Sequence, residues 1–159
     1  MKEIKDLDII YNKCVAEGNL QEPEEIDIEK SKSLLDNVNQ DLDTLKDIIP
    51  IMEKKKNYSL IWSNNYELFR QLVQGILLLE KVRSGNHQCL YAYICTKHNE
   101  WNIDWETIET MRLLRNGVHY EGRPVSAETW KEYKLKFHVY IQSFIKILTQ
   151  RINDFDQKL

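Results

Sequence analysis

Residues 60–83 read LIWSNNYELFRQLVQGILLLEKVR, and this stretch decides the fold. Its apolar side chains recur at steps of three and four residues, which is the spacing of one helix face. They cover a wide arc of the helix rather than a narrow stripe, which indicates that other elements enclose it. We therefore predict that a helix over residues 60–83 is the most buried element of the protein. The arc consists of Tyr66, Phe69, Leu72, Val73, Ile76, Leu77 and Leu79.

The remaining sequence has the same helical period, and no segment shows the sustained alternation that is typical of strands. Five glycines and three prolines in 159 residues leave little punctuation, so we expect long helices joined by short loops. Short connections favour antiparallel neighbours. The predicted class is therefore all-α, an up-and-down antiparallel bundle of four to five main helices with a short N-terminal helix. The expected helices are residues 2–17, 28–49, 60–83, 87–98, 104–118 and 126–153.

Several of these helices have sequence signals at their ends. Asp27, Asp104 and Ser126 each precede an apolar-periodic segment and are predicted N-caps. Pro50 should kink or end the second helix, because proline removes a backbone donor and clashes with the preceding turn. We divide the chain into residues 1–25, a helix and linker, and residues 26–159, the bundle.

The last helix carries large apolar groups at every third or fourth position. We expect this stripe to belong to the core, and to form a dimer face if one small bundle does not cover all of it. Its members are Trp130, Tyr133, Phe137, Tyr140, Ile141, Phe144, Ile147, Leu148 and Ile152.

The overall charge gives no signal for nucleic acid, with 22 basic against 25 acidic side chains. The distribution is uneven, since residues 1–60 hold 9 basic and 14 acidic groups whereas residues 61–159 hold 13 and 11. Any polyanion must therefore be bound by a local patch and not by a bulk field. The densest candidate patch is Arg112, Arg115, Arg123, Lys131, Lys134 and Lys136.

Three cysteines are too few and too odd in number for a disulfide framework, so we predict reduced, partly buried thiols in a cytoplasmic protein. Cys89 and Cys95 would lie about 120° apart on a helix, so they do not converge with His98 on a zinc ion. No metal site and no cofactor is predicted. The N-terminal residues lack the apolar core of a signal peptide. The longest aliphatic run, residues 76–79, is too short to span a bilayer, so no membrane association is expected.

The polar groups with the most suggestive chemistry lie at the end of the predicted helix 104–118. Arg112 and His119 are seven residues apart and differ by only about 20° around the helix axis. Arg115 and Asn116 lie on either side of them, within a sector of roughly 100°. Two fixed cations beside one titratable imidazole suit a phosphodiester. The alternative interpretation is an ordinary solvated helix end. The helix dipole by itself favours cations at a C-terminus and gives the same pattern.

His87 is a second candidate, for anion binding. It follows the Ser-Gly-Asn sequence of residues 84–86 at the start of a helix, where backbone N–H groups favour anions. A capping loop with an incidental histidine is the alternative interpretation.

Three stretches in this order resemble the HEPN superfamily, and most of all its compact prokaryotic members. They are residues 66–78 (YELFRQLVQGILL), 84–90 (SGNHQCL) and 114–122 (LRNGVHYEG), and the resemblance covers about residues 26–150. It implies an all-α bundle that forms a homodimer. Many members are metal-independent ribonucleases whose site joins an arginine to a histidine four to six residues later, with two copies meeting across the dimer. Some are toxins held in check by a small nucleotidyltransferase partner, the antitoxin, and others are catalytically silent binding modules.

The family motif can be placed on this sequence in two ways. Arg115 is followed at once by Asn116, as in the family, but only three residues separate it from His119. Arg112 has six intervening residues before His119, which is within the family range, but it is followed by leucine. Some toxin members carry a tyrosine two places after the histidine, whereas Tyr120 is adjacent here.

The resemblance therefore implies a cytoplasmic homodimer that is either a metal-independent endoribonuclease or a silent module binding nucleotide, RNA or a nucleotidyltransferase. In the active alternative, a neutral His119 takes the proton from a ribose 2′-OH and the arginines stabilise charge on the phosphate. The candidate catalytic residues are Arg112, Arg115, Asn116 and His119, and the candidate binding residues are His87, Tyr120 and Arg123.

Overall fold

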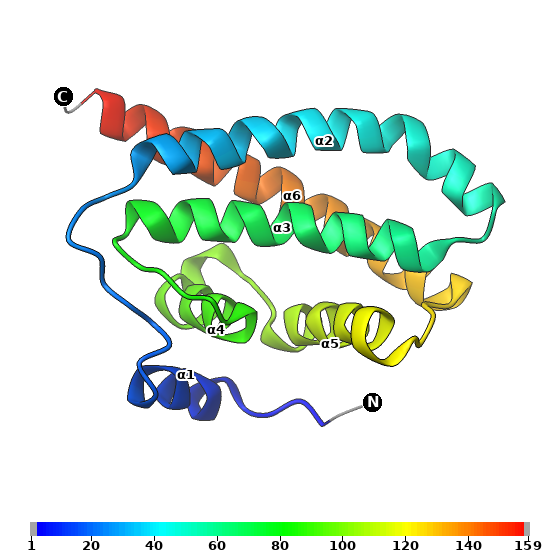
Figure 1. Cartoon of the computed structure of the whole chain (residues 1–159), viewed down its shortest axis with the longest axis horizontal. Helices are drawn as coiled ribbons and strands as arrows, with labels where there is room; N and C mark the ends of the chain where they lie inside the picture. The colour runs from blue at the N-terminus through cyan, green and yellow to red at the C-terminus, as the bar shows by residue number, and fades with distance from the viewer. Residues whose placement is uncertain (1–2, 158–159) are drawn as a thin grey trace.

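A computed structural model describes residues 3–157 of the chain, and within this range the protein is all-α. Six helices pack as an antiparallel bundle, which confirms the predicted fold class (Figure 1). None of the helices formed by these residues is both long enough and apolar enough to cross a bilayer. The elements are α1 (Leu7–Ala16), α2 (Ile28–Lys54), α3 (Tyr58–Leu79), α4 (His87–Lys97), the 3₁₀ turn η1 (Asn99–Trp101), α5 (Trp105–Glu121) and α6 (Ala127–Asp156).

Helix α3 is the centre of the bundle, as its wide apolar arc predicts. It contacts α2, α4, α5 and α6. In Figure 1, α2 runs antiparallel along one side of α3, α6 crosses behind, and α4 and α5 lie on the other side, with α1 outermost beyond α4. Because α5 runs antiparallel to α3, polar residues that line up on both helices can form one continuous surface.

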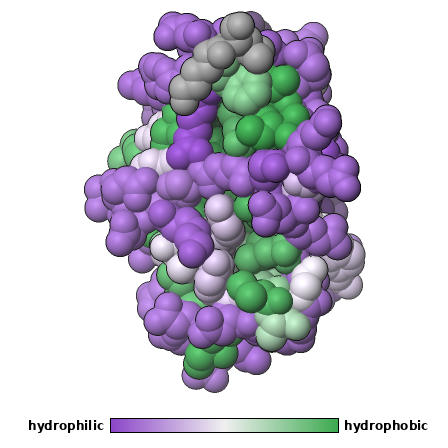
Figure 2. Space-filling model, turned by 90° about the vertical axis from the view of Figure 1, so that its left-hand side faces the viewer, coloured by the Kyte–Doolittle hydropathy of each residue, from purple (hydrophilic) through white to green (hydrophobic). Residues whose placement is uncertain are grey.

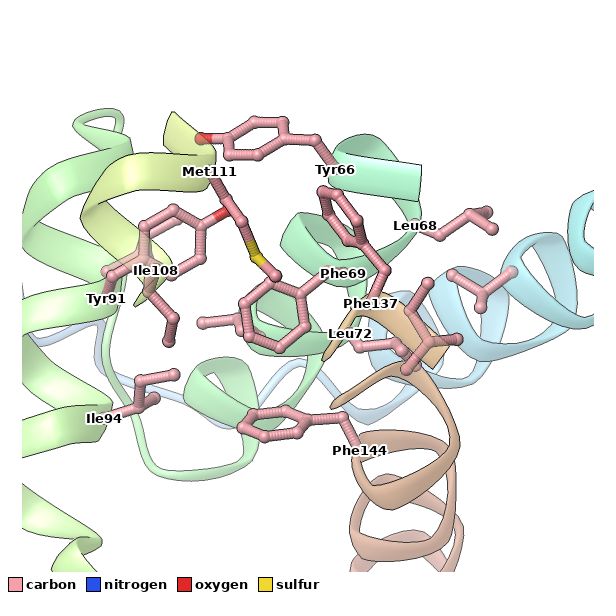
Figure 3. Close-up of a cluster of buried hydrophobic side chains, with 14 of the residues drawn as sticks. Tyr66, Leu68, Phe69, Leu72, Tyr91, Ile94, Ile108, Met111, Phe137 and Phe144 are labelled. Carbon is pink, nitrogen blue, oxygen red and sulfur yellow. The ribbon is translucent and has the colours of Figure 1, made fainter. Parts of the chain in front are cut away.

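Aromatic side chains from several helices meet around α3 (Figure 3). Phe69 stacks on Tyr91 of α4 with ring centroids 5.6 Å apart, and meets Phe144 of α6 edge-on at 5.0 Å. Gly75 lets α6 approach closely, because a Cβ atom there would lie 2.8 Å from Leu148 Cδ2. The α3–α5 contact is fixed by Trp62, whose indole N–H donates to the carbonyl oxygen of Met111 at 3.1 Å. These contacts hold α5 in register against α3.

The apolar stripe of α6 is mainly core. Trp130, Phe137 and Phe144 are at most 2% exposed, and the bundle itself covers them. The prediction that this stripe belongs to the core is therefore confirmed for these side chains. The large apolar groups that α6 does expose, Leu135 and Val139, are turned away from them.

The surface at one end of the bundle is mostly polar. Figure 2 views the end at which α2 begins and α6 ends, and there hydrophilic side chains surround small, separate apolar patches. A shallow hollow at this end is lined by Ile26, Leu79, Arg151, Asp154 and Phe155.

The helix starts agree with the sequence signals, while several helix ends differ. The side chains of Asp27, Asp104 and Ser126 each accept a backbone N–H three residues ahead, as predicted for N-caps. Of the two effects predicted for Pro50, a kink or an end of the helix, the end does not occur, because α2 continues to Lys54. The missing N–H of the proline removes one backbone hydrogen bond, to the residue four positions earlier, and the residues after it keep theirs.

Two further helix ends are set by backbone conformation. α3 ends at Leu79 instead of residue 83, because Lys81 adopts a left-handed conformation with φ 56° and the chain turns there. α5 continues to Glu121, three residues beyond the expected end, and stops at Gly122, which has φ 65°. Glycine adopts this conformation without a steric penalty, so it ends the helix here. Tyr120 is therefore helical and does not belong to a loop.

The expectation of three reduced thiols is wrong. Cys14 of α1 and Cys89 of α4 form a disulfide, with Cα atoms 5.6 Å apart, and Cys95 is buried and unpaired. The spacing argument compared cysteines that are close in sequence, whereas these two are separated by 75 positions and meet because α1 packs on α4. Ile10 and Ala92 complete this second, smaller core.

Candidate functional site

A line of polar side chains runs along the contact between α3 and α5. We call it the α3–α5 strip and define it as Ser63, Tyr66 and Arg70 of α3, His87 of α4, and Arg112, Arg115 and His119 of α5. At 1.5 Å per residue, the seven positions from Arg112 to His119 span about 10 Å along the helix axis. The strip is thus longer than a single phosphate group, with His119 at one end and the arginines toward the other.

His119 lies at the exposed end of the strip, away from the core as expected. Its Nε2 is 3.2 Å from Ser63 Oγ, and no other hydrogen bond to it is formed within the described chain. In the tautomer whose Nε2–H donates to Ser63, the Nδ1 atom keeps its lone pair and can accept a proton. Ser63 therefore orients an imidazole that remains open to solvent.

Arg115 is one helical turn before His119 and keeps its charge uncompensated. Its guanidinium carbon lies 5.7 Å from the ring centre of Tyr66 and 5.8 Å from that of Tyr120, and its Nη1 donates to Asn116 Oδ1 at 3.4 Å. None of its contacts within residues 3–157 is an ion pair. Two aromatic rings therefore position a half-buried cation without neutralising it.

Arg112 differs from Arg115 because a buried carboxylate holds it. Its Nε and Nη2 donate to the two carboxylate oxygens of Glu109 at 2.7 and 2.9 Å, and Glu109 is only 1% exposed. Gln88 of α4 donates a third hydrogen bond to the same carboxylate at 2.7 Å. Arg112 therefore has a structural role, and Glu109 balances its charge. This ion pair was not predicted from the sequence.

His87 is turned into the strip and not toward the backbone of its own helix. Its Nδ1 lies 3.2 Å from Tyr66 Oη. The N–H groups of Gln88 and Cys89, which we expected to welcome an anion, are capped by the Asn86 side chain at 3.0 and 3.3 Å. The capping loop of the alternative interpretation is therefore present, while the imidazole itself points to α3.

The electrostatics at His87 favour a neutral imidazole. Burial lowers its pKa, and so do the charges of Arg70, Arg115 and Arg112, while Glu67 opposes them. Burial raises the pKa of Tyr66 to about 12, so this phenol keeps its proton at neutral pH. Around His87 the cations thus outweigh the anions.

The remaining predicted binding residues lie at the C-terminal end of α5, with Tyr120 in its last turn and Arg123 just after it. Tyr120 is 77% exposed, and Arg123 forms an ion pair with Glu121. A small cavity of about 150 Å³ opens on this side of α5, and Asn116, Arg112 and Arg123 are among its lining residues. Asn116 therefore faces this cavity, next to the strip.

The contribution of α3 to the site was not predicted from the sequence. Ser63, Tyr66 and Arg70 follow one another at steps of three and four residues, which is the signal that places them on one face. Tyr66 was assigned to the core. Its ring is buried in the core, while its hydroxyl belongs to the α3–α5 strip. Arg70 is held by Glu67 and by Gln74, whose Oε1 accepts from Nη1 at 2.8 Å.

The part of the chain that the structure describes contains no group of three or more His, Cys, Asp or Glu side chains arranged to hold a metal ion. Comparisons with protein-family models, with curated proteins and with solved structures found no match to this chain.

Proposed function

We propose that this protein is a HEPN-like endoribonuclease that cleaves RNA without a metal ion, with Arg115 and His119 as its central pair. The observation that carries the proposal is the arrangement on α5. A guanidinium without a carboxylate partner in the described chain lies one helical turn from an exposed, hydrogen-bonded imidazole. An arginine presents a planar fork of N–H donors that matches phosphate oxygens.

The proposed reaction is a transfer within the RNA strand. His119 Nδ1 takes the proton of the ribose 2′-OH, and the 2′-oxygen attacks the adjacent phosphorus. The bond from phosphorus to the 5′-oxygen breaks, which leaves a 2′,3′-cyclic phosphate on one product. Arg115 stabilises the charge on the phosphoryl oxygens, and Asn116, within reach of Arg115, orients its guanidinium.

The departing 5′-oxygen needs a proton, and the proposed donor is His119 of the partner subunit in a homodimer. The exposed ring of Tyr120 supports an interface at this end of α5, because a large aromatic group beside the site is a typical contact residue. A two-fold interface uses the same patch twice and would bring two strips together. Light scattering at micromolar concentration should give twice the 19.0 kDa chain mass.

A second candidate function is a catalytically silent module that binds RNA, a nucleotide or a small nucleotidyltransferase. The observation that favours it is the ion pair of Arg112 with buried Glu109, which removes one of the two arginines assigned to the scissile phosphate. Such a module would use Arg115 for binding alone.

The test is cleavage of single-stranded RNA in EDTA by the wild type and by two histidine variants. His119→Ala should lower the rate by about 10²–10⁴, which is the usual contribution of general base catalysis. His138→Ala is the matched control, because His138 is an exposed histidine of α6 outside the strip, and its rate should equal the wild type. Cleavage by His119→Ala at the full rate would refute the proposal. No cleavage by the intact dimer would favour the silent module.

A further inference from the structure

We infer that His87, Tyr66 and Arg115 form a second phosphate subsite, so that a nucleic-acid strand binds along the α3–α5 strip through two successive phosphates. This inference rests on the proposed function for the first phosphate, which lies at Arg115 and His119. The second lies toward the His87 end. Arg115 stands between the two histidines and contributes to both subsites.

The hydrogen bond between Tyr66 and His87 engages Nδ1 and leaves the other ring nitrogen, Nε2, available to an anion. Tyr66 Oη and His87 Nδ1 are 3.2 Å apart, and in one tautomer of the ring the Tyr66 hydroxyl donates to Nδ1. The neutral imidazole then carries its proton on Nε2. This Nε2–H is a donor that no residue of the described chain accepts, and a phosphate oxygen would accept it.

The local charge balance also favours an anion. Arg70, Arg112 and Arg115 surround His87, whereas the nearby carboxylates are Glu67 and Glu109. Three fixed cations face two anions, so one positive charge remains, and Arg115 is the one of the three that forms no ion pair with residues 3–157. A single phosphodiester carries the one negative charge that would balance it.

The buried hydroxyl group of Tyr91, next to Tyr66, gives an independent observation. Tyr91 is 0% exposed, and its Oη has no hydrogen-bond partner of standard geometry among residues 3–157, while burial and the neighbouring Tyr66 hydroxyl raise its pKa. Its ring meets that of Tyr66 edge-on with centroids 5.9 Å apart, and Figure 3 shows both hydroxyl groups turned toward α5. An unpaired polar group is costly in a protein interior, so a buried hydroxyl beside Tyr66 is consistent with a polar site at this point of the strip.

The first test uses thymidine trinucleotides, which lack the 2′-OH and so cannot be cleaved by the proposed reaction. The probes are dTpdTpdT and its two isomers in which one phosphodiester is replaced by an uncharged methylphosphonate. Isothermal titration should show that either replacement weakens binding to the wild type by roughly tenfold, the size of one charge-assisted hydrogen bond. In His87→Gln, the loss caused by one of the two replacements should become smaller than in the wild type, because only the Arg115 contact to that phosphate remains.

The second test follows His87 in the wild-type protein, so it does not depend on a variant that folds. The pKa of His87 is read from its ring proton by NMR, with and without saturating dTpdTpdT. A phosphate beside the ring stabilises the imidazolium, so the pKa should rise on binding. His98, which is stacked on Trp101 outside the strip, is the internal control and should not respond.

The outcomes separate the subsite from the proposed catalysis. An unchanged His87 pKa, or methylphosphonate effects that are the same in His87→Gln and in the wild type, would overturn the subsite even if RNA is cleaved. If both DNA tests succeed and RNA is not cleaved, the subsite stands and the proposed catalysis fails. A response that inorganic phosphate alone reproduces at equal concentration would assign the site to free phosphate and overturn the two-phosphate strand.

Discussion

Arg112 and Arg115 are one turn apart on α5, yet their removal should affect stability very differently. Arg112→Met leaves Glu109, which is 1% exposed, without its cationic partner. Removal of one member of a buried pair destabilises by about 3–5 kcal/mol, and because the Arg112 side chain is still 15% exposed we expect the lower end, about 3 kcal/mol. Arg115→Met loses only two cation–π contacts at the surface, which contribute about 0.5–1 kcal/mol each and often less.

The assay is urea unfolding followed by tryptophan fluorescence. With a denaturant slope of about 2 kcal/mol per molar, the midpoint should fall by about 1.5 M in Arg112→Met and by less than about 1 M in Arg115→Met. The double change Glu109→Leu with Arg112→Met should recover most of the loss, because replacing both members of a buried pair by apolar groups is often neutral. Equal midpoints for the two arginine variants, or a double variant less stable than Arg112→Met, would refute the assignment of Arg112 to the fold and Arg115 to the site.

Three further outcomes follow from the geometry. Cys14→Ser should destabilise by about 4 kcal/mol, since the bond to Cys89 closes a loop of 75 positions, and dithiothreitol should have the same effect in the wild type; a urea midpoint that does not respond to reductant would contradict this. The pKa of His87 is lowered in the folded state, so its stability contribution is complete above the unfolded pKa of about 6.5 and is lost as pH falls toward the folded value. The wild type should therefore lose more stability than His87→Gln between pH 7.5 and pH 5, and parallel pH profiles would argue against it. Gly75→Ala should destabilise the protein by about 1–3 kcal/mol and so lower its melting temperature, because the new methyl group overpacks the core against Leu148. Calorimetry should detect this decrease. A higher melting temperature would mean that Leu148 moves aside without penalty.

The fold was predictable because its signals are local and repeated. The apolar arc of residues 60–83 identifies the central helix, and the caps at Asp27, Asp104 and Ser126 start their helices at the predicted places. Pro50 does not end α2, because a proline affects the turn before it and leaves the following residues free to continue the helix. The true end of α3 is set by the left-handed conformation of Lys81, for which a lysine gives no signal.

The site was predictable only where one helix carries it. Arg112, Arg115 and His119 share a face because of their spacing on α5. The partners that decide their roles come from elsewhere in the sequence: Ser63 and Tyr66 from α3, and Gln88 from α4. A helical wheel cannot show that a buried glutamate three residues earlier neutralises one arginine while the other lies between two tyrosines. Likewise, no spacing rule links Cys14 to Cys89.

The proposed chemistry depends on the 2′-OH of the substrate, and this dependence gives the most direct measurement. The protein is incubated in EDTA with a single-stranded RNA and with the same strand carrying one 2′-deoxy sugar at the cleavage position, and mass spectrometry identifies the product ends. We expect the RNA to yield a 2′,3′-cyclic phosphate, and the substituted strand to stay intact at that position. Cleavage at the deoxy position, or a product that never carries the cyclic phosphate, would contradict Arg115 and His119 as a metal-independent ribonuclease pair.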